Sequence, residues 1–192
     1  MTITTAEFAA LERQVRVLTD RAEITGLIDG YLLSLDGGRF DEAWARRHFT
    51  PDVRFTSPVG SHDGIEGLAE HEQATLDKFE RTQHMGANYL IDLDGDRAAV
   101  RWNALMTHVH LAATQQSRGE TPGAHFDVGG TFTGEAVRTP AGWRLRRLDV
   151  QAIWTTGRGP RTLTPQAEAT LHTLAGPARE RSVIDTGRHQ SN

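Results

Sequence analysis

Two residues that lie far apart in the chain carry the side chains needed for acid–base chemistry. Asp36 ends an apolar run with helical spacing, and His84 opens an expected strand, each among apolar residues. A carboxylate that holds an imidazole is the simplest way to make a general base near neutral pH. If the fold brings Asp36 and His84 together, the pair would remove a proton from a small organic molecule.

The surroundings of Asp36 admit two interpretations. A negative charge at the C-terminal end of a helix is unfavourable to the helix dipole, which is unusual for a purely structural residue. An aspartate followed by Gly37 and Gly38 is also ordinary turn chemistry. Tyr31, on the same apolar run, is either a core aromatic or a phenol that protonates a leaving group or hydrogen-bonds to a carbonyl.

The expected strand from residue 100 to 111 carries a second group of candidates. Because side chains alternate along a strand, one face presents a shared set of residues: Trp102, Ala104, Met106, His108 and His110. If this face lines a cavity, His108 or His110 is a second acid–base group. Their spacing also suits a metal, but no carboxylate-rich segment accompanies them, so we expect no metal site. An exposed strand end explains these histidines as well.

Arg147 lies on the last expected strand. Trp143 and Leu145 have core character, and strict alternation carries Arg147 toward the same interior. The alternative is that Arg144, Arg146 and Arg147 form a solvated or subunit-facing run of charge. We take Arg147 as the arginine that faces the site.

The elements that must position these residues begin with helices. Apolar residues recur every three to four positions in two runs, one ending near Leu18 and one at Leu35. Thr19 or Asp20 is expected to cap the second helix, with Glu23 placed to complete a capping box.

Further short elements follow the glycine pair that ends this run. Helices are expected from residue 41 to about 48 and from about 64 to 79. Between them, Thr50-Pro51-Asp52 indicates a turn, and residues 53–55 indicate a short strand.

From His84 onward the hydrophobic period changes to two. The pattern predicts two hairpins: residues 88–93 with 97–111 across Asp94-Gly95, and residues 126–138 with 143–154 across residues 139–142. The polar stretch 112–124 is expected to be a loop, 166–174 a weak helix, and 180–192 disordered. Helices followed by antiparallel strands indicate an α+β domain with helices on one face of a curved sheet.

Composition excludes several classes of protein. The 192 residues suit one domain, and 38% hydrophobic with 24% charged residues is ordinary for a globular chain. A net charge of −4 gives no reason to expect nucleic-acid binding. No apolar stretch approaches the ~18 residues of a membrane span. The absence of cysteine excludes disulfides, thiolate metal sites and cysteine nucleophiles.

Targeting and cofactor motifs are also missing from the sequence. The N-terminus lacks the basic region and apolar core of a signal peptide. With no cysteine in the chain, a reducing cytoplasm is the default location. No GxGxxG, P-loop, GxSxG or HExxH motif occurs, and we expect no cofactor.

The order of turns and aromatic residues resembles a known family, the SnoaL-like branch of the nuclear-transport-factor-2-like superfamily. The resemblance covers roughly residues 19–156. It rests on these residues: Tyr31-x4-Asp36, Trp44, Phe49-Thr50-Pro51-Asp52, Gly64, Gln83-His84, Asn88, Asp94-Gly95-Asp96-Arg97-Ala98, Gly130-Thr131-Phe132 and Gly142-Trp143-Arg144-Leu145. Within the superfamily the pattern is nearest to hexachlorocyclohexane dehydrochlorinase, scytalone dehydratase and bile-acid 7α-dehydratase.

The resemblance implies a fold and a site. It implies helices packed on a strongly curved mixed or antiparallel sheet in a cone-like barrel, with residues 1–18 as a helical extension and 157–192 as a partly disordered one. It implies that Asp36 orients His84 as the proton-abstracting base, and that an arginine of the last strand, taken as Arg147, steadies the leaving group. Tyr31 or Asn88 is a further group that would stabilise charge. The expected cavity walls are Trp44, Phe55, Asn88, Trp102, Met106, His108 and Phe132.

The predicted function is therefore cofactor-independent elimination on a small hydrophobic substrate. A polyketide cyclase or a ketosteroid-isomerase-type enzyme would begin with the same proton abstraction. A non-catalytic ligand-binding or assembly module is the alternative outside enzymes. By resemblance, a homodimer or homotrimer is expected, without nucleic-acid or membrane partners.

Overall fold

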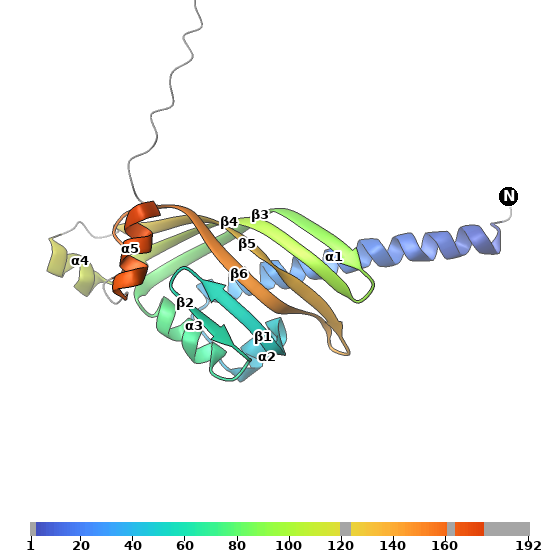
Figure 1. Ribbon diagram of the computed structural model, residues 1–192, viewed down its shortest axis with the longest axis horizontal. Coiled ribbons are helices and arrows are strands. Elements are labelled where there is room, and N and C mark those ends of the chain that lie inside the picture. The colour runs from blue at the N-terminus through green and yellow to red at the C-terminus, as the bar shows by residue number, and fades with distance from the viewer. Residues whose placement is uncertain (1–2, 120–123, 161–163, 175–192) are drawn as a thin grey trace, which may run out of the picture.

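The structure, a computed structural model, describes residues 3–119, 124–160 and 164–174, and in it helices pack against one six-stranded sheet (Figure 1). The sheet is mixed, with strand order β2-β1-β6-β5-β4-β3; β1 and β6 run parallel and the other neighbours antiparallel. The edge strands β2 and β3 do not pair, so the sheet is open and curled. The fold is the expected α+β arrangement.

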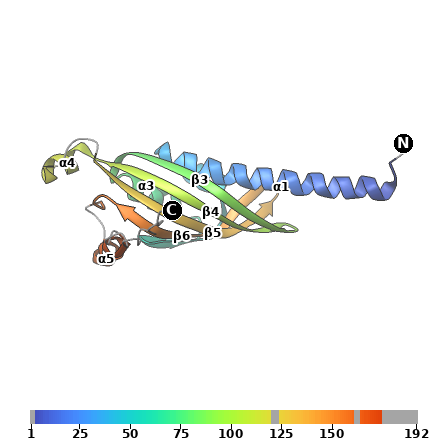
Figure 2. The same cartoon turned by 90° about the horizontal axis from the view of Figure 1, so that it is seen from above.

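The first helix, α1 (Thr5–Asp36), is one continuous element. The expected break at Thr19 or Asp20 is wrong, since the capping box lies at Thr4 and Glu7 instead. Asp20 faces inward and pairs with Arg138, so its carboxylate serves a tertiary contact. The helix ends at Asp36 as expected. Its C-terminal half packs along β3, and its N-terminal part projects past the sheet (Figures 1 and 2).

A compact group of short elements follows α1. They are α2 (Glu42–His48), β1 (Phe49–Ser57), β2 (Gly60–Asp63) and α3 (Leu68–Leu76). The Asp41 carboxylate accepts a hydrogen bond from the Trp44 backbone N–H at 2.6 Å and so caps α2. The expected turn at residues 50–52 is wrong, because these residues belong to an irregular start of β1, whose register with β6 shifts between Phe49 and Arg54.

The two predicted hairpins are present and longer than expected. They comprise β3 (Phe79–Asp94) with β4 (Arg97–His110), and β5 (His125–Thr139) with β6 (Gly142–Thr156). Because β3 already begins at Phe79, His84 lies inside the strand and does not open it. The segment expected as a loop contains α4 (Ala112–Arg118), and the weak helix near the end is α5 (Pro165–Leu174). Residues 180–192, expected to be disordered, lie outside the described residues.

Two bulges bend β6 around β5. The pairing shifts between Gly129 and Gly130, and again between Glu135 and Ala136. A Cβ on Gly130 would lie 2.8 Å from the Gln151 carbonyl oxygen, and one on Gly134 would lie 2.2 Å from that of Arg147. Glycine is therefore required where the β6 backbone comes close, and the bulges increase the local twist that curls the sheet.

The core lies between the helices and the inner face of the sheet. The alternation along β4 is complete, with Ala98, Val100, Trp102, Ala104 and Met106 buried and the residues between them exposed or partly exposed. No helix within the described ranges is long and apolar enough to span a membrane.

Candidate active site

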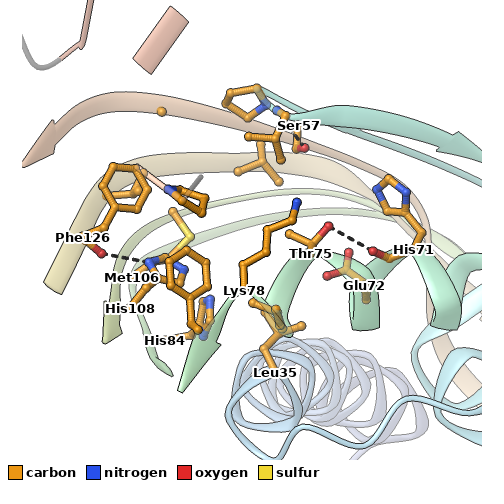
Figure 3. Close-up of a pocket in the computed structure, with 18 of the residues that line it drawn as sticks. Leu35, Ser57, His71, Glu72, Thr75, Lys78, His84, Met106, His108 and Phe126 are labelled. Atoms are coloured by element: carbon orange, nitrogen blue, oxygen red, sulfur yellow. Dashed lines mark hydrogen bonds between the residues drawn. The ribbon is translucent and has the colours of Figure 1, made fainter. Parts of the chain in front are cut away.

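A cavity of about 140 Å³ lies between the inner face of the sheet and the helices (Figure 3). Its walls come from α1, α3, α5 and all the strands except β2, together with four residues of the connecting segments: Pro58, Val59, Lys78 and Pro160. Most lining side chains are apolar: Leu35, Phe55, Pro58, Val59, Leu76, Phe79, Met106, Phe126, Val128, Phe132, Val150, Ala152, Pro160 and Leu171. Such a wall excludes water and strengthens the electrostatic interactions of the few polar groups in it.

The structure brings Asp36 and His84 into direct contact. The His84 ring Nδ1 lies 2.7 Å from Asp36 Oδ1, and the His84 backbone N–H donates to Oδ2 at 3.0 Å. The Thr82 hydroxyl donates to Oδ1 at 3.0 Å. The end of α1 meets the first half of β3 at this point, because α1 packs along that strand. The predicted carboxylate–imidazole pair is therefore present at the cavity.

The hydrogen bonds keep Asp36 ionised. Partial burial by itself raises the pKa of Asp36, but the ring and backbone donors of His84, with the Thr82 hydroxyl, outweigh it and lower the pKa below its usual value. An ionised carboxylate can only accept, so the proton in this contact sits on His84 Nδ1. In the neutral tautomer with this proton, Nε2 is the unprotonated nitrogen. No described residue is hydrogen-bonded to Nε2, and the His84 side chain lines the cavity.

His108 lies beside His84 in the same wall. The two rings meet edge to face, with centroids 5.4 Å apart. The Phe126 carbonyl oxygen lies 3.0 Å from His108 Nδ1 and can only accept, so Nδ1 carries the proton. Burial, and then the neighbouring His84, lower the pKa of His108 to about 4. His108 is therefore neutral at pH 7 and presents no second proton to the cavity.

Tyr31 also lines the cavity. Its position five residues before Asp36 does not place the two side chains on the same face of α1. Its ring packs against Trp44, His48 and Phe49. Burial, and then the charge of Glu72, raise the pKa of Tyr31 well above its ordinary value, so its hydroxyl keeps its proton. It is at once a core aromatic and a cavity residue.

The expected wall residues divide into two groups. Phe55, Met106 and Phe132 line the cavity as predicted. Trp44 and Trp102 are buried but lie outside its lining: the Trp44 indole donates to the Ser34 hydroxyl at 2.7 Å, and Trp102 stacks on Phe132. These two tryptophans support the wall from behind.

Asn88 and Arg147 do not reach the cavity. Asn88 sits at the irregular pairing of β3 with β4, has φ of 59°, and accepts a hydrogen bond from Asn103 on the exposed side. Arg147 pairs with Asp149 on the outer face. The bulge beside Glu135 inserts one extra residue, so the alternation from Leu145 resumes inward at Leu148 and turns Arg147 outward. The expectation that Arg147 faces the interior is wrong.

Three charged or titratable residues of the lining were not predicted: His71, Glu72 and Lys78. Glu72 has the clearest signal in the sequence, since Leu68 and Leu76 lie one turn away on either side. A carboxylate at that spacing falls on the apolar face of α3. His71 is adjacent to it, and Lys78 joins α3 to β3 with its side chain extending into the cavity (Figure 3).

Metal ligation finds no support in this arrangement. Within the described ranges, no three histidine, aspartate or glutamate side chains are grouped to hold an ion. His110, the other candidate, has its Nε2 2.7 Å from the Arg158 carbonyl oxygen, behind the cavity lining.

The comparisons with known proteins agree with this architecture. Residues 16–149 match the SnoaL-like domain. The uncharacterised protein Rv2910c of Mycobacterium tuberculosis is 31% identical over 151 residues, which is 76% of this chain and 96% of that protein.

Solved structures show the same fold. The Kfla4162 protein of Kribbella flavida is 26% identical, with a TM-score of 0.66 over 73% of this chain and 95% of that one. A protein of Novosphingobium aromaticivorans, provisionally assigned as a scytalone dehydratase, is 21% identical, with a TM-score of 0.63 over 77% and 93%. A type 2 hexachlorocyclohexane dehydrochlorinase, LinA, is 18% identical, with a TM-score of 0.64 over 79% and 97%. Because residues 16–149, most of the chain, match the SnoaL-like domain, the chain belongs to the SnoaL-like family, and it has the nuclear-transport-factor-2-like fold.

Proposed function

We propose that this protein catalyses cofactor-independent elimination on a small hydrophobic molecule, with His84 as general base. The observation that carries the proposal is the 2.7 Å contact between His84 Nδ1 and Asp36 Oδ1 at the wall of an apolar cavity. The carboxylate fixes the tautomer, so the unprotonated Nε2 is available to a bound molecule. The dehydrochlorinase and dehydratase names among the structures of like fold support the reaction class.

The reaction begins at a C–H bond next to an activating carbonyl. His84 Nε2 takes the proton, and the Asp36 carboxylate stabilises the imidazolium that forms. The Tyr31 hydroxyl and the Lys78 ammonium are the groups of the lining that can stabilise the developing negative charge on oxygen. Water or halide then leaves from the adjacent carbon. General-base catalysis contributes on the order of 10²–10⁴-fold, and the apolar wall and these donors supply further stabilisation.

The first step can be tested before the natural substrate is known. Small cyclic ketones, which suit a cavity near the ~150 Å³ that holds a benzene ring, are incubated with the protein in D₂O. Proton NMR then follows deuterium exchange at the carbon next to the carbonyl. We expect exchange that requires His84 and is lost in His84→Ala.

The surface pair His125–Asp127 provides a matched control. Its Nδ1–Oδ1 distance is 2.9 Å and it lies outside the cavity lining. His125→Ala should leave exchange unchanged. Ligand binding without exchange would contradict the proposal and favour a binding module. With 3-cyclohexenone as the ketone, migration of its double bond into conjugation would identify an isomerase.

A further inference from the structure

A buried carboxyl group faces the cavity from the side opposite His84. Glu72 is 6% exposed and lines the cavity from α3, while His84 and His108 line it from β3 and β4 (Figure 3). Among the residues that the structure describes, none is hydrogen-bonded or ion-paired to the Glu72 side chain. A carboxylate without a partner in apolar surroundings is costly, so the protonated form is favoured.

The other titratable or charged groups of the cavity are Tyr31, His71, Lys78, His84 and His108. Burial lowers the pKa of His71, which favours its neutral form, and the Lys78 ammonium is the group assigned above to the carbonyl oxygen. The Nδ1 protons of His84 and His108 are held by Asp36 and by the Phe126 carbonyl. The Tyr31 phenol holds its proton too strongly to release it near neutral pH. Burial raises the pKa of Glu72 to about 7, where a group can both give and regain a proton.

We propose that Glu72 is the general acid of this site and that the substrate is a β-hydroxy carbonyl compound about one ring in size. The inference rests on the proposed elimination and names its leaving group. Glu72 would be a catalytic residue in contact with the departing oxygen, across the cavity from the base.

The step balances without any co-reactant. The C–H bond next to the carbonyl breaks and its proton goes to His84 Nε2. The C–O bond at the β-carbon breaks, and the leaving hydroxyl takes the proton of Glu72, so that water and an α,β-unsaturated carbonyl form. The site then holds an imidazolium and a carboxylate, and one proton passes from His84 through water to Glu72 to restore the starting state.

The acid decides which leaving group is expelled. Hydroxide is a much poorer leaving group than chloride, and proton transfer from an acid accelerates its departure as water, whereas chloride departs without a proton. A buried proton donor therefore speeds loss of water and is superfluous for loss of chloride. This chemistry favours a hydroxyl-bearing substrate over a halogenated one.

The first test measures binding and does not depend on turnover. Methoxycyclohexane, whose ether oxygen stands in for the leaving oxygen and can only accept a hydrogen bond, is titrated into the protein from pH 5 to 9, with methylcyclohexane as a probe that cannot accept one. We expect methoxycyclohexane binding to weaken above about pH 7 in the wild type. In Glu72→Gln, whose amide donates at every pH, and with methylcyclohexane, this dependence should vanish. Glu70→Gln, on the exposed side of α3, should retain the wild-type pH dependence.

The second test follows turnover of 3-hydroxycyclohexanone and 3-chlorocyclohexanone, each corrected for its rate without protein. Glu72→Gln should lose about 10²-fold or more of the water-elimination rate while keeping chloride loss and deuterium exchange near wild type. His84→Ala should lose all three. Equal effects of Glu72→Gln on both leaving groups would overturn the general-acid role.

The two tests separate the two proposals. Binding that is independent of pH, or that keeps its pH dependence in Glu72→Gln, overturns the role of Glu72 even if His84 proves to be the base. Binding controlled by Glu72 without any exchange or elimination supports a proton-donating carboxyl in the cavity and overturns elimination as the function.

Discussion

His84 donates two hydrogen bonds to the Asp36 carboxylate, one to each oxygen: its ring Nδ1–H to Oδ1 at 2.7 Å and its backbone N–H to Oδ2 at 3.0 Å. The carboxylate therefore fixes both the strand and the ring of the same residue. A rotated or displaced imidazole would lose the ring contact while the backbone contact held the strand in place. This arrangement orients His84 more firmly than a ring contact alone.

Asp36→Asn should separate orientation from charge. The amide can keep the backbone contact, but its NH₂ group can donate to Nδ1, which moves the ring proton to Nε2 and removes the base. We expect turnover and deuterium exchange to fall by about 10²–10⁴-fold, with the fold retained by circular dichroism. The control Asp127→Asn alters a His–Asp contact outside the cavity lining, and comparable loss there would contradict the assignment.

Glu72 should make stability depend on pH in a defined window. Its pKa rises from 4.5 to about 7 on folding, so the folded state holds a proton that the unfolded state releases. The stabilisation is complete below pH 4.5 and is lost as pH rises toward 7, by about 3 kcal/mol in all. Urea unfolding at several pH values should show this loss in the wild type and in Glu70→Gln. If Glu72→Gln shows the same loss, the carboxyl group is not its source.

Arg147→Ala should leave function unchanged. The side chain is 56% exposed and pairs with Asp149 on the outer face of the sheet, where an ion pair contributes little to stability. We expect deuterium exchange at the wild-type rate and a free energy of unfolding within about 0.5 kcal/mol of the wild type. Loss of exchange with an intact fold would show that Arg147 acts at the site.

Gly134→Ala should destabilise the protein through the backbone. The new methyl group would lie 2.2 Å from the Arg147 carbonyl oxygen, so β5 and β6 must separate at the bulge. We expect a loss of about 3 kcal/mol in the free energy of unfolding. Gly26→Ala is the matched control, because no atom lies within 4 Å of its Cβ position and alanine favours a helix. Its free energy of unfolding should rise slightly.

The projecting part of α1 should mediate self-association. Phe8, Leu11, Val15 and Leu18 recur at three- and four-residue spacing and are each at least half exposed. A second copy of the helix would cover this stripe. We expect a dimer by light scattering at micromolar concentration, and monomers for the Leu11→Glu, Val15→Glu double variant. Gln14→Glu, which adds charge beside the stripe, should remain dimeric, and a monomeric wild type would contradict the proposal.

Patterns along the chain predict most of the helices and strands and much of the inner face. Hydrophobic periods of 3.6 and 2 identify both hairpins and the helices other than α4, although they miss β2, and alternation places Met106 and His108 on one face of β4, which faces inward. These features are local, because each follows from spacing along one element. The helical break predicted near Asp20 is absent. Aspartate often caps a helix, but here the Asp20 carboxylate binds Arg138, which is distant in the sequence.

Which of these residues meet depends on tertiary packing. The contact of Asp36 with His84 depends on α1 packing along β3, a relation that resemblance implied but spacing could not establish. Arg147 turns outward because a bulge permitted by Gly134 inserts one residue and reverses the alternation. Glu72 lies on the apolar face of its own helix, yet only the packing of α3 over the sheet shows that this face borders a cavity. Periodicity determines which side chains share one face of a helix or strand. Long-range packing determines which other elements that face contacts.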